Sequence, residues 1–459
     1  MSTVRDGDGS LQPAGGLFGR TGENPNPLIT HGEGTRLWDV AGREYFDSTS
    51  GAISVISIGH GRDEVVDAMA EQARNVAYVQ GGRFRNDVAD ELAQELAKFT
   101  PGDVNRAIFV SGGSEANETA IKLARAYQLA KGRPERYIIL SRDRSYHGNT
   151  LGALSLSGFD ARRADYQPLL LWEPQVARQN CYRCPFDLRY PECNLACAED
   201  LERAIQEVGP ERVSAFIAEP IVAAAGAATT PPPGYFERIR TICDQHDILF
   251  IADEVVTGLG RTGLNFGIDH WGVVPDIIVT AKGLAGGYVP LGAVLISERV
   301  EQAFTQAGTR FTHGYTYMSH PVTCAAGLAV LRIIEREGLV RNAAIQGERM
   351  FALLDEKIAP HPFVGDVRGK GLLAGIELVA ERESKLPFDP ALRVTQALLD
   401  AALARGIMLY PCASGDGVHS DQVLLSPPLN VTADEIDAIV DRFVLALRDI
   451  EPLLASPST

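Results

Sequence analysis

The 459-residue sequence has no run of about 20 consecutive apolar residues, the length that a membrane-spanning helix requires. Its first twenty residues also lack the apolar core of a secretory signal peptide. No block of Lys and Arg stands out, and 59 acidic against 43 basic residues give a formal net charge of −16. Because that charge repels phosphate backbones and anionic lipids, we expect neither nucleic acid nor a membrane as partner. These absences predict a cytoplasmic globular protein.

Cysteine is also scarce, but four of the seven cysteines fall in CYRCPFDLRYPECNLAC at residues 181–197. The spacing of Cys181, Cys184, Cys193 and Cys197 would permit a tetrahedral zinc site. It is less regular than that of a zinc knuckle, and thiols in aromatic loops often simply pack. A disulfide is disfavoured in a reducing compartment. We therefore favour loop packing, assign no metal, and leave open whether these thiols bind one.

Short apolar runs alternate with longer amphipathic stretches from about residue 105 onward. The runs lie at 106–110, 136–140, 213–219, 247–253 and 276–281. Residues 115–130 predict a helix, because Ile121, Ala124 and Tyr127 recur near helical spacing. Such alternation is typical of a mainly parallel sheet covered by helices, so we predict an α/β fold.

The two ends of the chain have a different pattern. Residues 364–379 and two helical stretches near 391–404 and 434–450 indicate a smaller α+β unit. The first 60 residues suggest turns and short strands with little core of their own. We expect a large domain over 61–335 and a small α+β domain over 336–459, with residues 1–60 packed against the small domain.

Two segments that follow predicted strands could receive a ligand. SGGSEANETAIKLAR at 111–125 places Gly113 and Ser114 between a strand and a helix, where backbone N–H groups and the helix dipole favour a phosphate. A strand-to-helix turn also needs Gly and an N-cap Ser for structural reasons alone. Tyr146 follows the strand at 136–140 and could stack on a flat heteroaromatic ring or pack within its loop.

Two charged residues end apolar strands. Asp253 in IADEV needs a partner if it is buried, either a protonated pyridine nitrogen or an ordinary N-cap or salt bridge, for example to Arg261. Lys282 follows the apolar run DIIVTA, where desolvation would lower its pKa and make its amine nucleophilic toward an aldehyde. A phosphate seat, a stacking ring, an acid and a reactive amine together describe one ligand, pyridoxal 5′-phosphate.

Seven ordered segments support this interpretation. They are HGEGTRLWDVAGREYFD (31–47), SGGSEANETAIKLAR (111–125), SYHGNTLGA (145–153), IADEVVTGLGRTG (251–263), TAKGLAGGYVPLGAV (280–294), YTYMSHPVTCAAGLAVL (315–331) and SPPLNVTADEID (426–437). In these segments the sequence resembles the class III aminotransferases, which are fold-type I pyridoxal-phosphate enzymes. The resemblance implies a three-layer α/β fold with an additional small α+β domain, and a homodimer whose active sites are shared between subunits.

The resemblance also implies roles for single residues. Lys282 would form a Schiff base with the cofactor and later carry a proton, and Asp253 would hold the ring nitrogen protonated. Tyr146 would stack on one face of the ring, and Val255 would cover the other.

Further cofactor contacts follow from the same resemblance. Gly113 and Ser114 would bind the phosphate, joined by Thr316 from the second subunit. His147 lies beside the stacking tyrosine, and Glu219 in AEP is similar to a family carboxylate below the cofactor.

The sequence departs from the family pattern at the substrate end. Relatives that act on 4-aminobutyrate or ornithine carry a glutamate and an arginine where this chain has Ala224 and Leu424, and Tyr410 stands where some amine transaminases carry an alternative arginine. Without such an arginine there is no bidentate grip for 2-oxoglutarate, so we favour a smaller acceptor such as pyruvate. The candidates to hold its carboxylate are Arg83, Arg85 and Arg261.

Ile53 in SGAISV matches the family position that sets room beside the amine substituent, although core packing explains it equally well. The sequence predicts an aminotransferase that moves an amino group from a primary amine or ω-amino acid to a small keto acid. The alternative is a lyase or decarboxylase using the same cofactor. A non-catalytic protein that binds a metal or a partner through its cysteines is disfavoured by Lys282.

Overall fold

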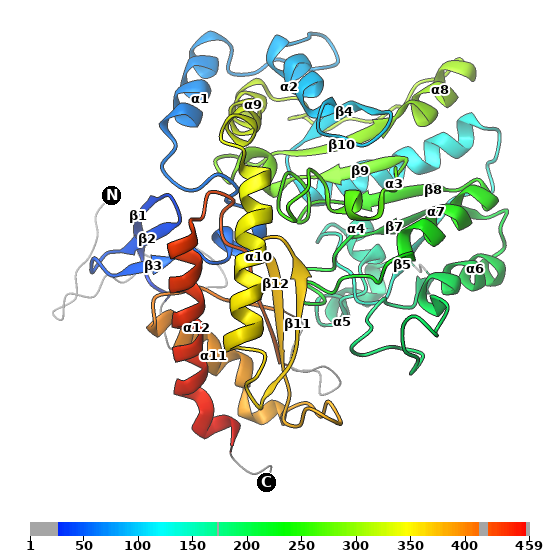
Figure 1. The fold of residues 1–459 in the computed structure, drawn as a ribbon. Helices are drawn as coiled ribbons and strands as arrows, with labels where there is room; N and C mark the ends of the chain where they lie inside the picture. Colours follow the sequence, from blue (N-terminus) through cyan, green and yellow to red (C-terminus); the bar gives the residue numbers. More distant parts are fainter. Residues whose placement is uncertain (1–25, 172–173, 413–420, 456–459) are drawn as a thin grey trace.

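The computed structural model describes residues 26–171, 174–412 and 421–455. Its centre is a seven-stranded sheet (Figure 1). The strands lie in the order β4 (Val104–Val110), β10 (Gly292–Ser297), β9 (Ile277–Thr280), β8 (Leu249–Asp253), β7 (Val213–Ala218), β5 (Ile138–Arg142) and β6 (Gln175–Val176). Strands β5 to β9 run parallel, whereas β10 is antiparallel to both of its neighbours. The predicted α/β fold with a mainly parallel sheet is confirmed.

Alternate residues of the buried strands face two separate cores, as the period of two requires. On β7, Ala215 and Ile217 join one apolar cluster while Phe216 and Ala218 join the other. The first cluster includes α3 (Gly113–Ala130) and α8 (Glu298–Gln306), and the second includes α6 (Ala196–Val208) and α7 (Tyr235–His246). Helices therefore cover both faces of the sheet, and its strand ends are left to form a site.

Helices α1 (Asp63–Asn75) and α2 (Asp87–Ala97) pack on α9 (Pro321–Arg336), which also contacts α10 (Leu339–Lys357). The small sheet has the order β11 (Val364–Lys370), β12 (Leu373–Leu378), β14 (Asp421–Leu425) and β13 (Tyr410–Pro411). Helices α11 (Val394–Ala404) and α12 (Ala433–Leu454) pack on each other, and α12 also packs on α10 (Figure 1).

The N-terminal strands form a sheet of their own, β1 (Ile29–Glu33), β2 (Arg36–Asp39) and β3 (Glu44–Phe46). The chain that leaves β3 joins the C-terminal part: Phe46 pairs with Ile407, and Ser426 N–H donates to Ser48 O at 2.8 Å. Residues 1–25 and 413–420, which belong to the predicted end segments, lie outside the described residues.

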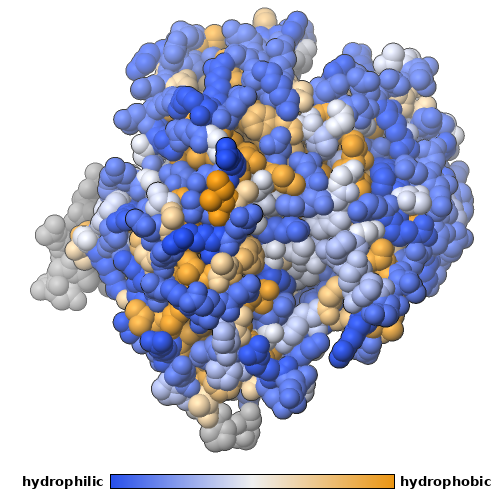
Figure 2. Space-filling view, viewed as in Figure 1, coloured by the Kyte–Doolittle hydropathy of each residue, from blue (hydrophilic) through white to orange (hydrophobic). Residues whose placement is uncertain are grey.

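The molecular surface contrasts with this interior. Hydrophilic residues predominate on the face drawn in Figure 2, with hydrophobic residues in separate patches among them. Among the described helices, we find none whose length and apolar content would let it cross a membrane.

A buried carboxylate holds the loop after β8. The side chain of Glu254 is 0% exposed and accepts hydrogen bonds from Gly267 N at 2.8 Å, Ile268 N at 2.7 Å and the Thr257 hydroxyl. No cation pairs with it among the described ion pairs. Burial raises the pKa of Glu254 from 4.5 to about 7, although these three hydrogen bonds oppose the shift.

This carboxylate predicts a pH dependence of stability. Because the pKa is higher in the folded state, the contribution of Glu254 to the free energy of unfolding is complete below 4.5 and is lost as the pH rises through about 7. The E254Q variant cannot titrate, so its stability should fall less over this window, by up to about 3 kcal/mol. Melting temperatures of both proteins measured at several pH values test this expectation, and parallel profiles would contradict it.

Candidate active site

Lys282 follows strand β9 and begins the short helical turn η4 (Lys282–Ala285). Its φ of 45° is in the left-handed region, which a residue with a side chain seldom adopts outside constrained sites. Its Nζ makes no hydrogen bond or ion pair that we find with the described residues, although Asp253 and Glu219 lie near enough to act on its charge. Burial lowers the pKa of Lys282, and these two carboxylates oppose that shift. The result is an amine poised to react as a nucleophile.

Asp253 ends β8 and is held by three donors. Its Oδ2 accepts from His147 Nδ1 at 2.7 Å and from Asn117 Nδ2 at 2.9 Å, and its Oδ1 accepts from Val255 N at 3.1 Å. The carboxylate is 3% exposed. These three donors fix the orientation of the carboxylate, which a partner for a ring nitrogen requires.

His147 therefore contributes to the site through its hydrogen bond to Asp253. Its backbone carbonyl also accepts from Asn117 Nδ2 at 2.7 Å, so one amide fixes both residues. Asn117 is 1% exposed on α3 and was not among the predicted site residues, although it lies within the SGGSEAN segment. Its position in a helix carries no local sign of these contacts, because they join segments that are distant in sequence.

Glu219 follows β7 and fixes the neighbouring aromatic. Its Oε1 accepts from Tyr146 N at 2.9 Å and its Oε2 from Ala223 N at 3.3 Å. Burial raises the pKa of Glu219, and the nearby His147 opposes that shift. The ring of Tyr146 makes an edge contact with Phe159, with centroids 6.4 Å apart.

The expected phosphate seat lies at the first turn of α3. Helix N-termini present unpaired backbone N–H groups, and here Gly113 and Ser114 supply them. A Cβ on Gly113 would lie 3.1 Å from the Val255 side chain, so the expected ring cover adjoins the expected phosphate seat. At Gly148, with φ of 135°, a Cβ would lie 2.5 Å from Ser114 Oγ. Glycine is therefore required at that position.

Two predicted residues, Thr316 and Arg85, are exposed. The carbonyl of Thr316 accepts from Tyr78 Oη at 2.6 Å. Placing Thr316 on a phosphate requires a second copy of the chain, so its role and the homodimer stay predictions. Arg85 pairs with Asp90 at 2.6 Å, with 87% of its side chain exposed.

Ile53 and Arg261 are buried. Ile53 is 4% exposed and packs in the larger apolar cluster, and its assignment to the substrate pocket stays a prediction. Arg261 is 1% exposed and donates to the carbonyl oxygens of Leu372 and Pro427. The structure therefore gives Arg261 a role in joining segments of the chain, where it is not available to hold a substrate carboxylate.

The cysteine segment follows β6 and ends in the first turn of α6, which contains Cys197. All seven cysteines are free thiols, and the thiol of Cys181 is exposed. Burial raises the pKa of Cys197 to about 12, so this thiol is a poor nucleophile. Within residues 26–171, 174–412 and 421–455 we find no group of three or more His, Cys, Asp or Glu side chains placed to hold a metal ion.

These residues fit pyridoxal 5′-phosphate. Lys282 offers the aldehyde an amine that no described residue engages, Asp253 offers the ring nitrogen a carboxylate, and the start of α3 offers a seat for the phosphate. When bound, the cofactor supplies an electron sink that stabilises negative charge on a substrate carbon. The site can then transfer protons and amino groups at that carbon.

Comparisons with known proteins give the same assignment. Residues 18–447 match the family model described as Aminotransferase class-III. The diaminobutyrate–2-oxoglutarate transaminase of Halomonas elongata is 35% identical, over 94% of this chain and 92% of that protein. The taurine–pyruvate aminotransferase of Bilophila wadsworthia is 37% identical, over 94% of each chain.

Solved structures agree with the sequence comparisons. An (S)-enantioselective ω-transaminase from Thermomicrobium roseum superposes with a TM-score of 0.89 and 38% identity, over 96% of each chain. The predicted fold-type I architecture and the predicted cofactor are confirmed. This chain belongs to the class III aminotransferases, enzymes that depend on pyridoxal 5′-phosphate.

Proposed function

We propose that this enzyme moves an amino group from a primary amine or ω-amino acid to pyruvate. The observation that carries the proposal is the position of Arg162, on the short helix α5 (Asp160–Arg163). Its guanidinium carbon lies 5.3 Å from the centre of the Tyr146 ring and 5.4 Å from that of Phe159. Arg162 is thus a cation beside the aromatic expected to stack on the cofactor.

Tyr410 belongs to the same corner of the site. Burial raises the pKa of Tyr410, and the neighbouring Arg162 guanidinium opposes that shift. Tyr410 occupies the position where some relatives carry an arginine, so Arg162 brings a guanidinium to this corner from a different segment. A guanidinium can hold a carboxylate through two parallel hydrogen bonds.

Among the described residues, the two positions at which relatives carry a glutamate and an arginine favour a short acceptor. Leu424 lies on β14 opposite Tyr410 and is 0% exposed, and Ala224 is 7% exposed. Neither side chain can bind the second carboxylate that 2-oxoglutarate carries. Arg261 is engaged with backbone carbonyls instead. The guanidinium of Arg162 can hold one carboxylate, which is what pyruvate carries.

The chain's own groups have separate tasks in this reaction. Lys282 Nζ would take the proton from the amine-bearing carbon and return one during the second half of the cycle. Asp253 would keep the ring nitrogen protonated, held in place by His147 and Asn117. Tyr146 would keep the ring flat and exclude water from one face.

The half-reactions test the proposed acceptor. Holoenzyme mixed with a primary amine should convert the cofactor to its aminated form, and pyruvate should reverse this change while 2-oxoglutarate should not. Reversal by 2-oxoglutarate alone would contradict the proposal. Release of ammonia or carbon dioxide without a keto acid would establish the lyase or decarboxylase alternative.

The R162Q variant tests the carboxylate grip. Loss of a charge-assisted contact should raise KM for pyruvate about tenfold, with a smaller change in KM for an amine donor that has no carboxylate. The KM of R162K for pyruvate should lie between those of the unchanged enzyme and R162Q, because lysine keeps the charge but lacks the planar group that makes two parallel hydrogen bonds. The matched control is R83Q, which alters another of the candidate arginines. If R83Q raised KM for pyruvate and R162Q did not, Arg83 rather than Arg162 would bind the carboxylate.

A further inference from the structure

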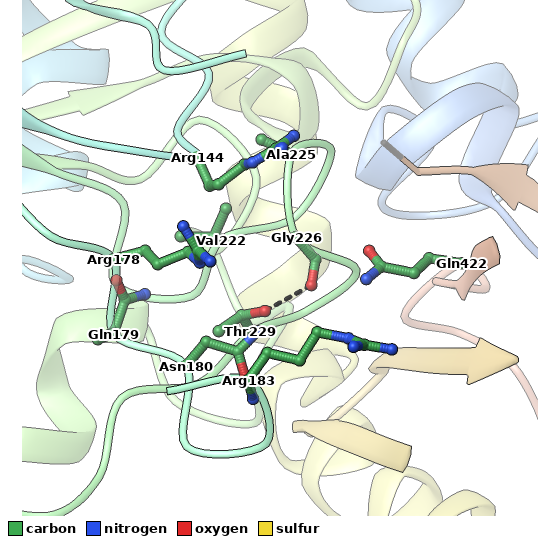
Figure 3. Close-up of a pocket in the computed structure, with 10 residues that line it drawn as sticks. All are labelled: Arg144, Arg178, Gln179, Asn180, Arg183, Val222, Ala225, Gly226, Thr229 and Gln422. Carbon is green, nitrogen blue, oxygen red and sulfur yellow. Dashed lines mark hydrogen bonds between the residues drawn. The ribbon is translucent and has the colours of Figure 1, made fainter. Parts of the chain in front are cut away.

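A second hollow opens between the large and the small sheet, with a volume of about 420 Å³ including its mouth (Figure 3). Its walls come from the chain after β5 and β6, from the turn after β7 and from β14. The lining residues used below are Arg178, Gln179, Arg183, Val222, Thr229 and Gln422. The residues assigned to the cofactor do not line it, so this hollow is a separate place from the site described above.

Gln179 indicates that the hollow receives a polar ligand. Its side chain is 1% exposed, and neither Oε1 nor Nε2 has a hydrogen-bond partner among the described residues. Native structures rarely leave both ends of a buried carboxamide unpaired, because each lost partner destabilises the fold. A ligand with one donor and one acceptor would satisfy both ends.

The neighbouring guanidinium groups add hydrogen-bond donors, and each is ion-paired with a carboxylate. Arg178 Nη1 donates to Asp143 Oδ2 at 2.6 Å. Arg183 Nε donates to Glu377 Oε1 at 2.5 Å, and its Nη2 donates to Lys385 O at 2.9 Å. An arginine has five N–H donors, so both side chains keep donors beyond these bonds. Such donors bind carboxylates well.

We propose that this hollow binds a small carboxylic acid that also carries a carboxamide or a comparable donor–acceptor group. Arg178 and Arg183 hold the carboxylate, and Gln179 pairs with the amide. Gln422 lies on the opposite wall, where its Nε2 donates to Glu377 Oε2 at 3.0 Å, so the ligand bridges the two parts of the protein.

The hollow shares a turn with the active site. Val222 and Thr229 pair through their backbones, and Thr229 Oγ1 donates to Gly226 O at 2.5 Å (Figure 3). From the same turn, Ala223 N–H donates to Glu219, the residue that holds Tyr146. A ligand that contacts this turn can therefore shift Tyr146 through Ala223 and Glu219. Binding of the ligand should then alter KM for the amine donor.

Succinamate is a suitable probe, because it has a carboxylate and an amide but neither an amino nor a keto group. Calorimetric titration of the holoenzyme should show binding. In Q179L the affinity should fall about tenfold, and in R178Q by a similar factor. R178Q changes a side chain that is 27% exposed, so it keeps the test valid if Q179L does not fold.

The controls separate this hollow from the active site. R162Q, which alters the proposed substrate grip, should bind succinamate as the unchanged enzyme does. Binding that is lost in R162Q but retained in Q179L would place the probe in the active site and overturn the proposal. Absence of binding at millimolar succinamate would overturn it as well. So would a crystal structure in which ordered waters alone satisfy Gln179 while the probe is present.

Discussion

The K282A variant is expected to bind pyridoxal 5′-phosphate without the absorbance band of the lysine-bound cofactor. Its turnover should fall on the order of 10⁴-fold, because the side chain serves both as nucleophile and as proton carrier. The geometry supports both roles: the amine has no ion-pair partner that we find among the described residues, and burial lowers its pKa. Absorbance spectra and steady-state rates of the purified variant measure the two effects.

The K282R variant is the matched control. Arginine keeps a positive charge near Asp253 and Glu219 but is too basic to act as a nucleophile. If the charge alone mattered, K282R would retain activity, whereas loss of the band in both variants indicates covalent attachment. A K282A protein that still showed the band would exclude Lys282 as the attachment point and would indicate that another lysine binds the cofactor.

The D253N variant should retain the cofactor but lose about 10³-fold in turnover. Asparagine preserves the size of the side chain and can still accept from His147 and Asn117, but it cannot hold a proton on the ring nitrogen by its charge. Cofactor content, the absorbance band and kcat are the measurements. Undiminished kcat would exclude the role of Asp253 as partner of the ring nitrogen.

N117A separates charge from positioning. It removes one donor, at 2.9 Å from Asp253 Oδ2, while leaving the carboxylate and His147 in place. We expect a loss of about tenfold, far below that of D253N. A loss as large as that of D253N would mean that orientation, rather than charge, accounts for the contribution of this carboxylate.

Lys282 and Asp253 could be predicted from sequence because their signal is local. Each is a charged residue directly after an apolar strand, and parallel strands bring their carboxyl ends to one edge of a sheet. The antiparallel direction of β10 could also be predicted from the length of its connection to β9. Only residues 281–291 separate it from β9, without a long crossover helix, and a parallel connection needs a dozen or more residues.

Arg162 and Asn117 could not be predicted in the same way. Asn117 meets Asp253 across 136 residues of chain, and its position in a helix carries no local sign of that contact. Arg162 lies on the short helix α5, where an exposed arginine is ordinarily just a solvated side chain. Both depend on how distant segments pack, which hydrophobic periodicity does not encode.

The pairing of the chain's two ends has a consequence for the order of folding. Ser48 and Ser50 bond to Met408 and Ser426, which are 360 and 376 residues away in sequence. During synthesis the N-terminal strands therefore remain without these partners until almost the whole chain has emerged. The large sheet, whose strands are closer in sequence, can form earlier. Contacts of such high sequence separation slow folding, so we expect closure of the two ends to be the last step.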